Sequence, residues 1–292
     1  MTNIIQTEKL TKYYGGVCGI KDLTLSVKEG DFFGFIGPNG AGKSTTIRTL
    51  LGLIAPSAGK AEIFGKDICT HRTEILADIG YLPSETAYYS GMRVKDLLTF
   101  SARMRGIDCE AEARALCERL MLDPSRKIRE LSFGNRKKVG IVCALQHRPR
   151  LCVLDEPTSG LDPLMQREFY EILTERNRVG MTVFLSSHVL SEIARYCRHA
   201  AVVRAGELLV SDSVEKLGHT GVKRVTLRGF SGEIGLSGAK DITKETDTVR
   251  FLYSGRAQEL MQALSAMPFD DVTVTDPDLE EVFLHYYTKE EA

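Results

Sequence analysis

The chain has 292 residues, of which 43% are hydrophobic and 26% are charged, with a formal net charge of -1 at pH 7. This composition is ordinary for a globular protein and excludes a disordered or fibrous chain. The near-zero net charge excludes a global basic field that would attract nucleic acid or anionic lipid. At roughly 150 residues per domain, the length indicates two domains, or one large domain with an appendage.

The apolar stretches and the cysteines indicate in which compartment of the cell the protein is expected. No stretch approaches the roughly 20 apolar residues that a membrane-spanning helix needs. The N-terminal residues lack the basic and apolar regions of a secretory signal. The seven cysteines include no C-x-x-C pair, and several lie in apolar runs. We therefore expect a chain that does not enter the membrane by itself, with buried thiols in a reducing cytoplasm.

The first part of the chain is predicted to be rich in strands. Residues 4–27 alternate in short runs, and Leu23, Leu25 and Val27 are predicted to share one strand face. Residues 32–37 form a continuous apolar run, which indicates a buried strand. A glycine-rich loop and a helical pattern follow, so this stretch predicts a strand, loop and helix unit.

The middle of the chain is predicted to be mostly helical. Residues 94–144 have helical spacing and no convincing strand. Two apolar strands follow at residues 151–156 and 182–187, with a helix at 166–178 between them. Strand, helix and strand in this order are typical of a parallel sheet in an α/β protein.

The pattern changes after Leu217. Short strands with two mixed faces alternate with amphipathic helices, which indicates a separate small α+β domain. We predict a first domain at residues 1–219 and an accessory domain at residues 220–292. Inside the first domain, a helical subdomain is expected at about 85–150.

The sequence GPNGAGKST at residues 37–45 fits the P-loop pattern, and it lies between a predicted strand and a predicted helix. Glycines allow the backbone N–H groups to turn toward phosphate oxygens, and the helix N-terminus favours negative charge. Lys43 would neutralise the β- and γ-phosphates, Ser44 would bind Mg²⁺, and Thr45 would hold the α-phosphate. The other predicted phosphate-binding residues are Gly37, Pro38, Asn39, Gly40, Ala41 and Gly42.

Two carboxylates end the strand predicted at residues 151–156. The carboxyl ends of parallel strands meet at one edge of the sheet, so Asp155 is expected near the P-loop, where it would reach Mg²⁺ through water. Glu156 would polarise a water molecule for attack on the γ-phosphate. The alternative is a solvated acidic pair at the end of a strand.

Three further motifs lead to a family. LDEPTSGLDP at 154–163, LSFGN at 131–135 and His188 after the next strand resemble the nucleotide-binding subunit of ATP-binding cassette (ABC) transporters. The resemblance covers residues 1 to about 217, with five motifs in the family's order. It implies a P-loop ABC ATPase with β-rich and helical subdomains, which hydrolyses ATP to drive transport.

The resemblance also assigns site residues. Ser132 and Gly134 match the signature residues that contact the γ-phosphate of a second copy, so that two subunits enclose two ATP molecules. Asp162 matches the loop that crosses the dimer interface. Tyr14 matches the aromatic residue that stacks on adenine, with Tyr13 as the alternative, and His188 matches the histidine that hydrogen-bonds the γ-phosphate.

The sequence departs from the family pattern at two places. Ser84 stands where a glutamine usually contacts Mg²⁺ and the attacking water, and Glu85 follows it. Glu85 either supplies an oxygen to the metal site or is a solvated loop carboxylate. The signature is LSFGN in place of LSGGQ, although the two phosphate-facing positions are retained.

Basic residues surround the signature. They could bind nucleic acid, but they alternate with apolar positions and lack interleaved aromatic residues, so a solvated helix face is the favoured interpretation. This cluster consists of Arg126, Lys127, Arg129, Arg136, Lys137 and Lys138.

The resemblance implies two protein partners and no nucleic acid. One is a second nucleotide-binding subunit, in a homodimer or a heterodimer. The other is a separate transmembrane permease, contacted near residues 84–98, which would hold the chain at the cytoplasmic face of the membrane. TDPDLEEVFL at 275–284 resembles the ending of drug and antibiotic exporter subunits, although an ordinary amphipathic helix is the alternative.

Two other function classes stay open at this point. The same core could belong to a soluble ATP-dependent clamp that acts on DNA or ribosomes. Long heptad coiled coils or two cassettes in one chain would favour the clamp, and the sequence has neither. A regulatory module without turnover is the other alternative, which Glu156 and His188 argue against.

Overall fold

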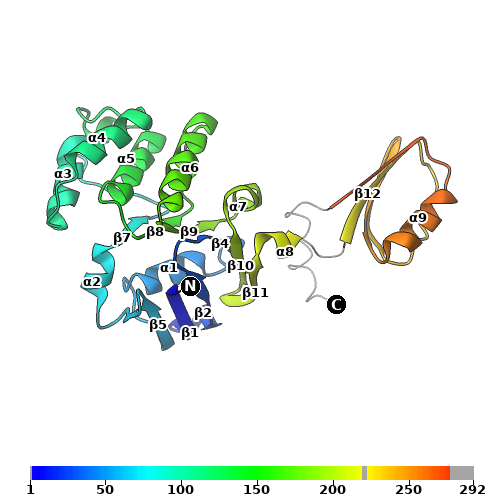
Figure 1. Ribbon diagram of the computed structural model, residues 1–292, viewed down its shortest axis with the longest axis horizontal. Coiled ribbons are helices and arrows are strands. Elements are labelled where there is room, and N and C mark those ends of the chain that lie inside the picture. Colours follow the sequence, from blue (N-terminus) through cyan, green and yellow to red (C-terminus); the bar gives the residue numbers. More distant parts are fainter. Residues whose placement is uncertain (1, 219–221, 277–292) are drawn as a thin grey trace. The chain divides into compact units, whose positions relative to one another are not determined.

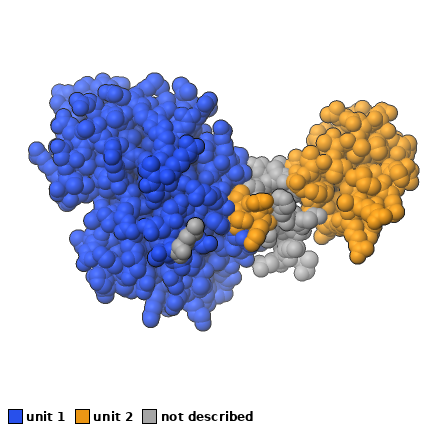
Figure 2. Space-filling model, viewed as in Figure 1, with its two compact units in different colours: residues 1–212 blue, residues 213–292 orange. Residues whose placement is uncertain are grey.

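The computed structural model describes residues 2–218 and 222–276 of the chain. The chain divides into two compact units, residues 1–212 and residues 213–292 (Figure 2). The boundary at residue 219 and the helical subdomain at 85–150 stay predictions. Among the described residues, no helix is both long enough and apolar enough to cross a membrane.

A six-stranded sheet lies at the centre of the first unit, in the order β11-β10-β4-β9-β8-β7. The pairs β10–β4, β4–β9, β9–β8 and β8–β7 are parallel. The strands are β4 (Phe32–Ile36), β7 (Ile79–Leu82), β8 (Leu151–Asp155), β9 (Thr182–Ser187), β10 (His199–Arg204) and β11 (Glu207–Ser213). β4, β8 and β9 are buried along their whole length, which explains their continuous apolar sequences. The predicted strands at 32–37, 151–156 and 182–187 are therefore confirmed.

A second sheet of the same unit is antiparallel, in the order β2-β1-β5-β6, and β3 pairs with β1. Its strands are β1 (Asn3–Tyr14), β2 (Val17–Leu23), β3 (Ser26–Lys28), β5 (Ala58–Ile63) and β6 (Lys66–Asp67). The single strand face expected for Leu23, Leu25 and Val27 is wrong, because Thr24 and Leu25 lie between two strands. All three side chains are nevertheless buried.

Helices cover the parallel sheet and extend away from it (Figure 1). They are α1 (Lys43–Leu50), α2 (Arg72–Ala77), α3 (Val94–Met104), α4 (Glu110–Arg119), the 3₁₀ turn η1 (Ile128–Glu130), α5 (Phe133–Leu145), α6 (Pro163–Arg178) and α7 (Leu190–Tyr196). α3, α4 and α5 pack together, and α5 also packs on β7. This helical group carries the LSFGN sequence to the edge of the parallel sheet.

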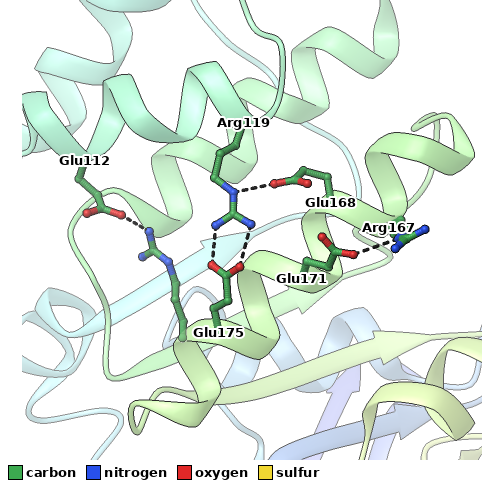
Figure 3. A network of polar contacts seen from close by, with 7 residues as sticks. Glu112, Arg119, Arg167, Glu168, Glu171 and Glu175 are labelled. Carbon is green, nitrogen blue, oxygen red and sulfur yellow. Dashed lines mark hydrogen bonds and ion pairs between the residues drawn. The ribbon is translucent and has the colours of Figure 1, made fainter.

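Ion pairs join α4 to α6 (Figure 3). Arg119 of α4 donates a hydrogen bond to Glu168 at 2.6 Å. It also donates to both carboxylate oxygens of Glu175, at 2.5 and 3.0 Å. Arg176 of α6 pairs with Glu112 of α4. Bidentate pairs of this kind fix geometry as well as charge. The network therefore connects the helical group of α3, α4 and α5 to α6.

The hydrophobic core of the first unit combines residues of both sheets with α1. Phe184 packs against Phe33 and Phe35, with ring centroids 5.9 and 5.3 Å apart. Four of the seven cysteines are buried, whereas Cys69 is exposed and Cys18 and Cys143 are half-buried. The prediction of buried thiols is thus wrong for Cys69. Burial raises the pKa of the Cys152 thiol to about 12.

In its described residues, the second unit is an antiparallel sheet with two helices, in the strand order β13-β14-β12-β15. Its elements are α8 (Val214–Gly218), β12 (Val222–Arg228), β13 (Ala239–Glu245), β14 (Thr248–Ser254), α9 (Ala257–Ser265) and β15 (Asp271–Thr275). Leu260 and Leu264 of α9 pack with Val225 and Phe251 in a separate small core. The predicted segment 275–284 lies, beyond Asp276, outside the described residues.

Candidate functional site

The ends of four parallel strands meet at one edge of the six-stranded sheet. Ile36 is paired with Ser187, Asp155 with Ser186, and Leu82 with Leu154. The loops that follow these strands therefore lie beside one another, which is where α/β proteins bind ligands. These loops contain the P-loop pattern, Ser84, the acidic pair and His188.

The loop at 37–45 connects β4 to α1. α1 begins at Lys43 after Gly42, which has no side chain to cover the amides of the first turn. Gly42 has a φ of 97°, and a Cβ at this position would lie 2.4 Å from the carbonyl oxygen of Gly19. Glycine is therefore required here for two reasons. The free first turn of α1 suits an anion such as phosphate.

Lys43 places its ammonium group inside this loop. The side chain is 7% exposed, and its Nζ donates to the carbonyl oxygens of Gly37 and Pro38 at 2.6 and 3.2 Å. The same Nζ lies 3.4 Å from Oε1 of Glu156. A buried cation at the bottom of an amide-lined loop is a phosphate-binding arrangement.

Glu156 joins two parts of the site. Its φ of 49° lies in the left-handed region, which is uncommon outside glycine, and its N–H donates to the carbonyl oxygen of Ser186. The carboxylate contacts Lys43 through Oε1, and Oε2 lies 2.7 Å from Nδ1 of His188. Oε1 is buried and makes no hydrogen bond. The turn after β8 thus directs this carboxylate between the loop lysine and the histidine.

Asp155 is buried at the end of β8 and is 1% exposed. Its Oδ1 accepts a hydrogen bond from Ser186 Oγ at 3.1 Å, whereas Oδ2 is buried without a hydrogen-bond partner. An unpartnered carboxylate oxygen next to a phosphate-binding loop fits a magnesium ion or a metal-bound water. Among the residues that the structure describes, there is no group of three or more acidic, histidine or cysteine side chains that could hold a metal ion.

Tyr14 lies at the end of β1, beside the phosphate-binding loop. A Cβ on Gly19 would be 3.0 Å from Thr45 Cγ2 and 3.2 Å from Tyr14 Cε2. The Tyr14 ring is 47% exposed, and Lys12 Nζ lies 5.3 Å from its centroid. An exposed aromatic ring next to the loop can stack on a base. Tyr13, the alternative, is also exposed.

The signature residues begin α5, on the helical group. The Ser132 side chain accepts a hydrogen bond from the Asn135 N–H at 3.3 Å and so caps the helix. Gly134 packs against Gly160, whose carbonyl oxygen would lie 2.4 Å from a Cβ on Gly134. Asp162 is exposed and caps α6 through the Met165 N–H at 3.0 Å. Both capping side chains thus have a structural task within this chain.

Ser84 is half-buried and Glu85 is exposed, directly after β7. The prediction of a solvated basic cluster is wrong for Lys137 and Lys138, which are 1% and 7% exposed. Lys137 donates to the carbonyl oxygens of Pro83 and Ser84. Sequence reasoning missed this contact because the periodicity of α5 does not show which loop covers it.

Comparisons with known proteins agree with these observations. The profile of the family described as ABC transporter matches residues 20–159. The bacitracin transport ATP-binding protein BcrA of Bacillus licheniformis is 40% identical over 215 residues, which span 72% of this chain and 69% of that protein. The linearmycin resistance ATP-binding protein LnrL of Bacillus subtilis is 29% identical, over 97% of each chain.

Solved structures show the same fold. The ATP-binding subunit of an ABC transporter superposes with a TM-score of 0.69 and 29% identity, over 73% of this chain and 91% of that one. A dimeric bacterial ABC transporter cassette has a TM-score of 0.64 and 25% identity, over 72% and 98%. The predicted P-loop fold and family resemblance are confirmed, and the alternatives of a clamp or a regulatory module find no support in these relatives. The chain belongs to the ABC transporter family, as a subunit that binds and hydrolyses ATP.

Proposed function

We propose that this ATPase powers export through a separate membrane permease, at whose cytoplasmic side it is held. The single observation that carries the proposal is the Glu156 carboxylate between Lys43 and His188, beside the loop at 37–45. The names of two relatives, which refer to bacitracin transport and linearmycin resistance, support export. The chemistry of the exported molecule is not encoded in this site.

The loop at 37–45 holds the triphosphate. Backbone N–H groups of this loop surround the phosphate oxygens, and Thr45 lies toward the α-phosphate. These N–H groups belong to Gly37, Asn39, Gly40, Ala41 and Gly42. Lys43 exchanges its contact with Glu156 for the β- and γ-phosphates, a stronger pairing because phosphate carries more charge. Tyr14 stacks on the adenine.

Ser44 and Asp155 are the residues that hold magnesium in this proposal. The unpartnered Oδ2 of Asp155 would accept a hydrogen bond from a metal-bound water, and the Ser44 hydroxyl would be a ligand of the metal. When bound, Mg²⁺ neutralises charge on the β- and γ-phosphate oxygens. The exposed Glu85 would add a second carboxylate to this magnesium site only when the site is closed over the nucleotide.

Glu156 and His188 carry the reaction. The oxygen of a water molecule attacks the γ-phosphorus, and the bond from that phosphorus to the bridging oxygen breaks with its electron pair left on ADP. Glu156 accepts the water proton as general base. His188, held by Glu156 through Nδ1, presents Nε2 to a γ-phosphate oxygen.

A second nucleotide-binding subunit completes the site. Ser132 and Gly134 lie at the N-terminal end of α5, where backbone amides and the helix dipole favour the γ-phosphate bound by the partner's loop. Asp162 lies exposed at the start of α6, on the loop that would cross the interface. A similar cassette is described as dimeric, which supports the arrangement.

The permease binds the helical group. Tyr89 is 72% exposed, and Phe100 and Met104, one turn apart on α3, are 47% and 73% exposed. Exposed apolar side chains of this kind mark protein interfaces. Tyr89 lies within the predicted contact segment at 84–98, and Phe100 and Met104 follow it.

A mixing experiment tests the shared site. Lys43→Ala removes the phosphate cation, and Ser132→Asp keeps the cap of α5 while repelling phosphate. Each variant alone is inactive. Mixed in equal amounts, they recover about a quarter of the parent rate, because half of the dimers have one intact site of two. Ser132→Asn keeps the cap without the charge and is the matched control. No recovery contradicts a site shared between copies of this chain.

A further inference from the structure

Lys137 is a cation enclosed within the protein, on the second turn of α5. Its side chain is 1% exposed, and its Nζ donates to the carbonyl oxygens of Pro83 and Ser84 at 3.0 and 2.9 Å. Burial lowers the pKa of this lysine to about 8, while the negative charges of Asp155 and Glu156 act in the opposite direction. A buried charge is costly, so a lysine kept here calls for a reason.

Sheet register explains why this ammonium is close to the acidic pair. Leu82 of β7 is paired with Leu154 of β8, and the two strands are parallel. Pro83 and Ser84 therefore leave the sheet beside Asp155 and Glu156. Lys137 binds the backbone of the first pair of residues and lies in the field of the second pair.

The same face of α5 supports the rest of this loop. Gly140 follows Lys137 by three residues, so both lie on one side of the helix. A Cβ on Gly140 would lie 2.6 Å from Leu82 Cδ1, 2.7 Å from Tyr88 Oη and 3.2 Å from Thr86 Cγ2. The loop after β7 thus lies tightly along α5, and Lys137 holds the part nearest to Glu156.

We propose that Lys137 is a positioning residue for ATP hydrolysis, which fixes the backbone of Pro83 and Ser84 beside Glu156 and ties it to the helix that begins with the signature. The inference rests on the proposed role of Glu156 as general base. Ser132 is the N-terminal cap of α5. Any movement of this helix therefore reaches the backbone at Ser84 through Lys137. ATP binding depends on the loop at 37–45, whereas the hydrogen bonds of the Lys137 Nζ go to the backbone of Pro83 and Ser84.

Steady-state ATPase kinetics of the full chain test this role. Lys137→Met keeps the apolar stem and removes both the donor and the charge. We expect kcat to fall about tenfold or more and KM for ATP to stay within about threefold, since small displacements near the reacting atoms affect the chemical step. Lys138→Met removes the neighbouring buried lysine of the same helix without touching the 83–84 backbone, and it should stay within about twofold of the parent.

A second variant keeps the test valid if Lys137→Met folds poorly. Lys137→Gln retains an amide donor for a carbonyl oxygen and lacks the charge, so its kcat should lie between those of Lys137→Met and the parent. A kcat within about twofold of the parent in both variants overturns the inference, provided that Glu156→Gln is inactive. A fall in kcat matched by an equal rise in KM also overturns it. If Glu156→Gln is active, the proposed function itself fails.

Discussion

Nδ1 of His188 lies 2.7 Å from Oε2 of Glu156, across the ends of β9 and β8. This contact leaves Nε2 as the ring atom available to phosphate. We expect His188→Ala to lower kcat about 10²-fold, because it removes both the phosphate contact and the support of the base. The dissociation constant for ATP should change little, and equilibrium binding of a fluorescent ATP analogue measures it. A His188→Ala variant with the kcat of the parent would show that His188 takes no part in the reaction.

Lys43 is the only side-chain cation that the described contacts place inside the loop at 37–45. Lys43→Ala should weaken Mg-ATP binding by about 10²-fold or more, since a charge-assisted contact to two phosphates is lost. Isothermal titration calorimetry measures the affinity. Lys21→Ala, at an exposed ion pair with Glu207, is the control. Near-normal affinity in Lys43→Ala would contradict the phosphate-binding assignment.

His147 is expected to lower the free energy of unfolding at acid pH. Burial, followed by the charge of Arg105, lowers its pKa from 6.5 to about 4. Its Nε2 contacts the Ile79 carbonyl oxygen at 3.1 Å, and Nδ1 is buried without a hydrogen-bond partner. A proton on Nδ1 would therefore have no acceptor, and the nearby charge of Arg176 opposes it while Asp78 favours it.

Because the folded pKa is below the unfolded value, the unfolded chain binds more protons as the pH falls through 6.5. Stability is full above pH 6.5 and decreases until about pH 4, by about 2 kcal/mol for this partly buried ring. Urea unfolding of His147→Gln at pH 7 and pH 5 should show a smaller pH effect than the parent. His71→Gln, at an exposed histidine, should keep the parent's pH effect. An equal pH effect in all three proteins would remove His147 as the cause.

Arg119 fastens α4 to α6 through two carboxylates (Figure 3). Arg119→Met should lower the free energy of unfolding by about 1 kcal/mol, the range of a half-exposed bidentate network. Arg167→Met removes an exposed pair with Glu171 within α6 and should cost less than about 0.5 kcal/mol. Raising the salt concentration should reduce the difference. Equal effects in both variants would mean that the α4–α6 pairs add nothing.

The domain boundary predicted at residue 219 is tested by truncation. The fragment 1–219 contains the loop at 37–45, Glu156 and His188, and the second unit has its own core. We expect the fragment to stay folded and to bind ATP with an affinity within about threefold of the full chain. Circular dichroism and ATP titration measure both. Loss of folding together with ATP binding would make residues 220–292 part of the same domain.

Some of the site could be predicted from local sequence and some could not. The continuous apolar run before Gly37 predicts a buried strand, and the glycine and lysine spacing after it predicts phosphate chemistry. The short strand β7 escaped prediction because four residues carry no clear period. Lys137 resembled a solvated helix residue in sequence, and only the pairing of β7 with β8 reveals the loop that covers it.

The most direct test of the central claim is the Glu156→Gln variant, measured for ATP hydrolysis, ATP affinity and dimer formation. The amide cannot accept the water proton, so hydrolysis should fall by about 10² or more. Affinity for ATP should be retained, and size-exclusion chromatography with ATP should show a stable dimer. A variant that hydrolyses ATP at the parent rate would contradict the account, because Glu156 would then not be the general base.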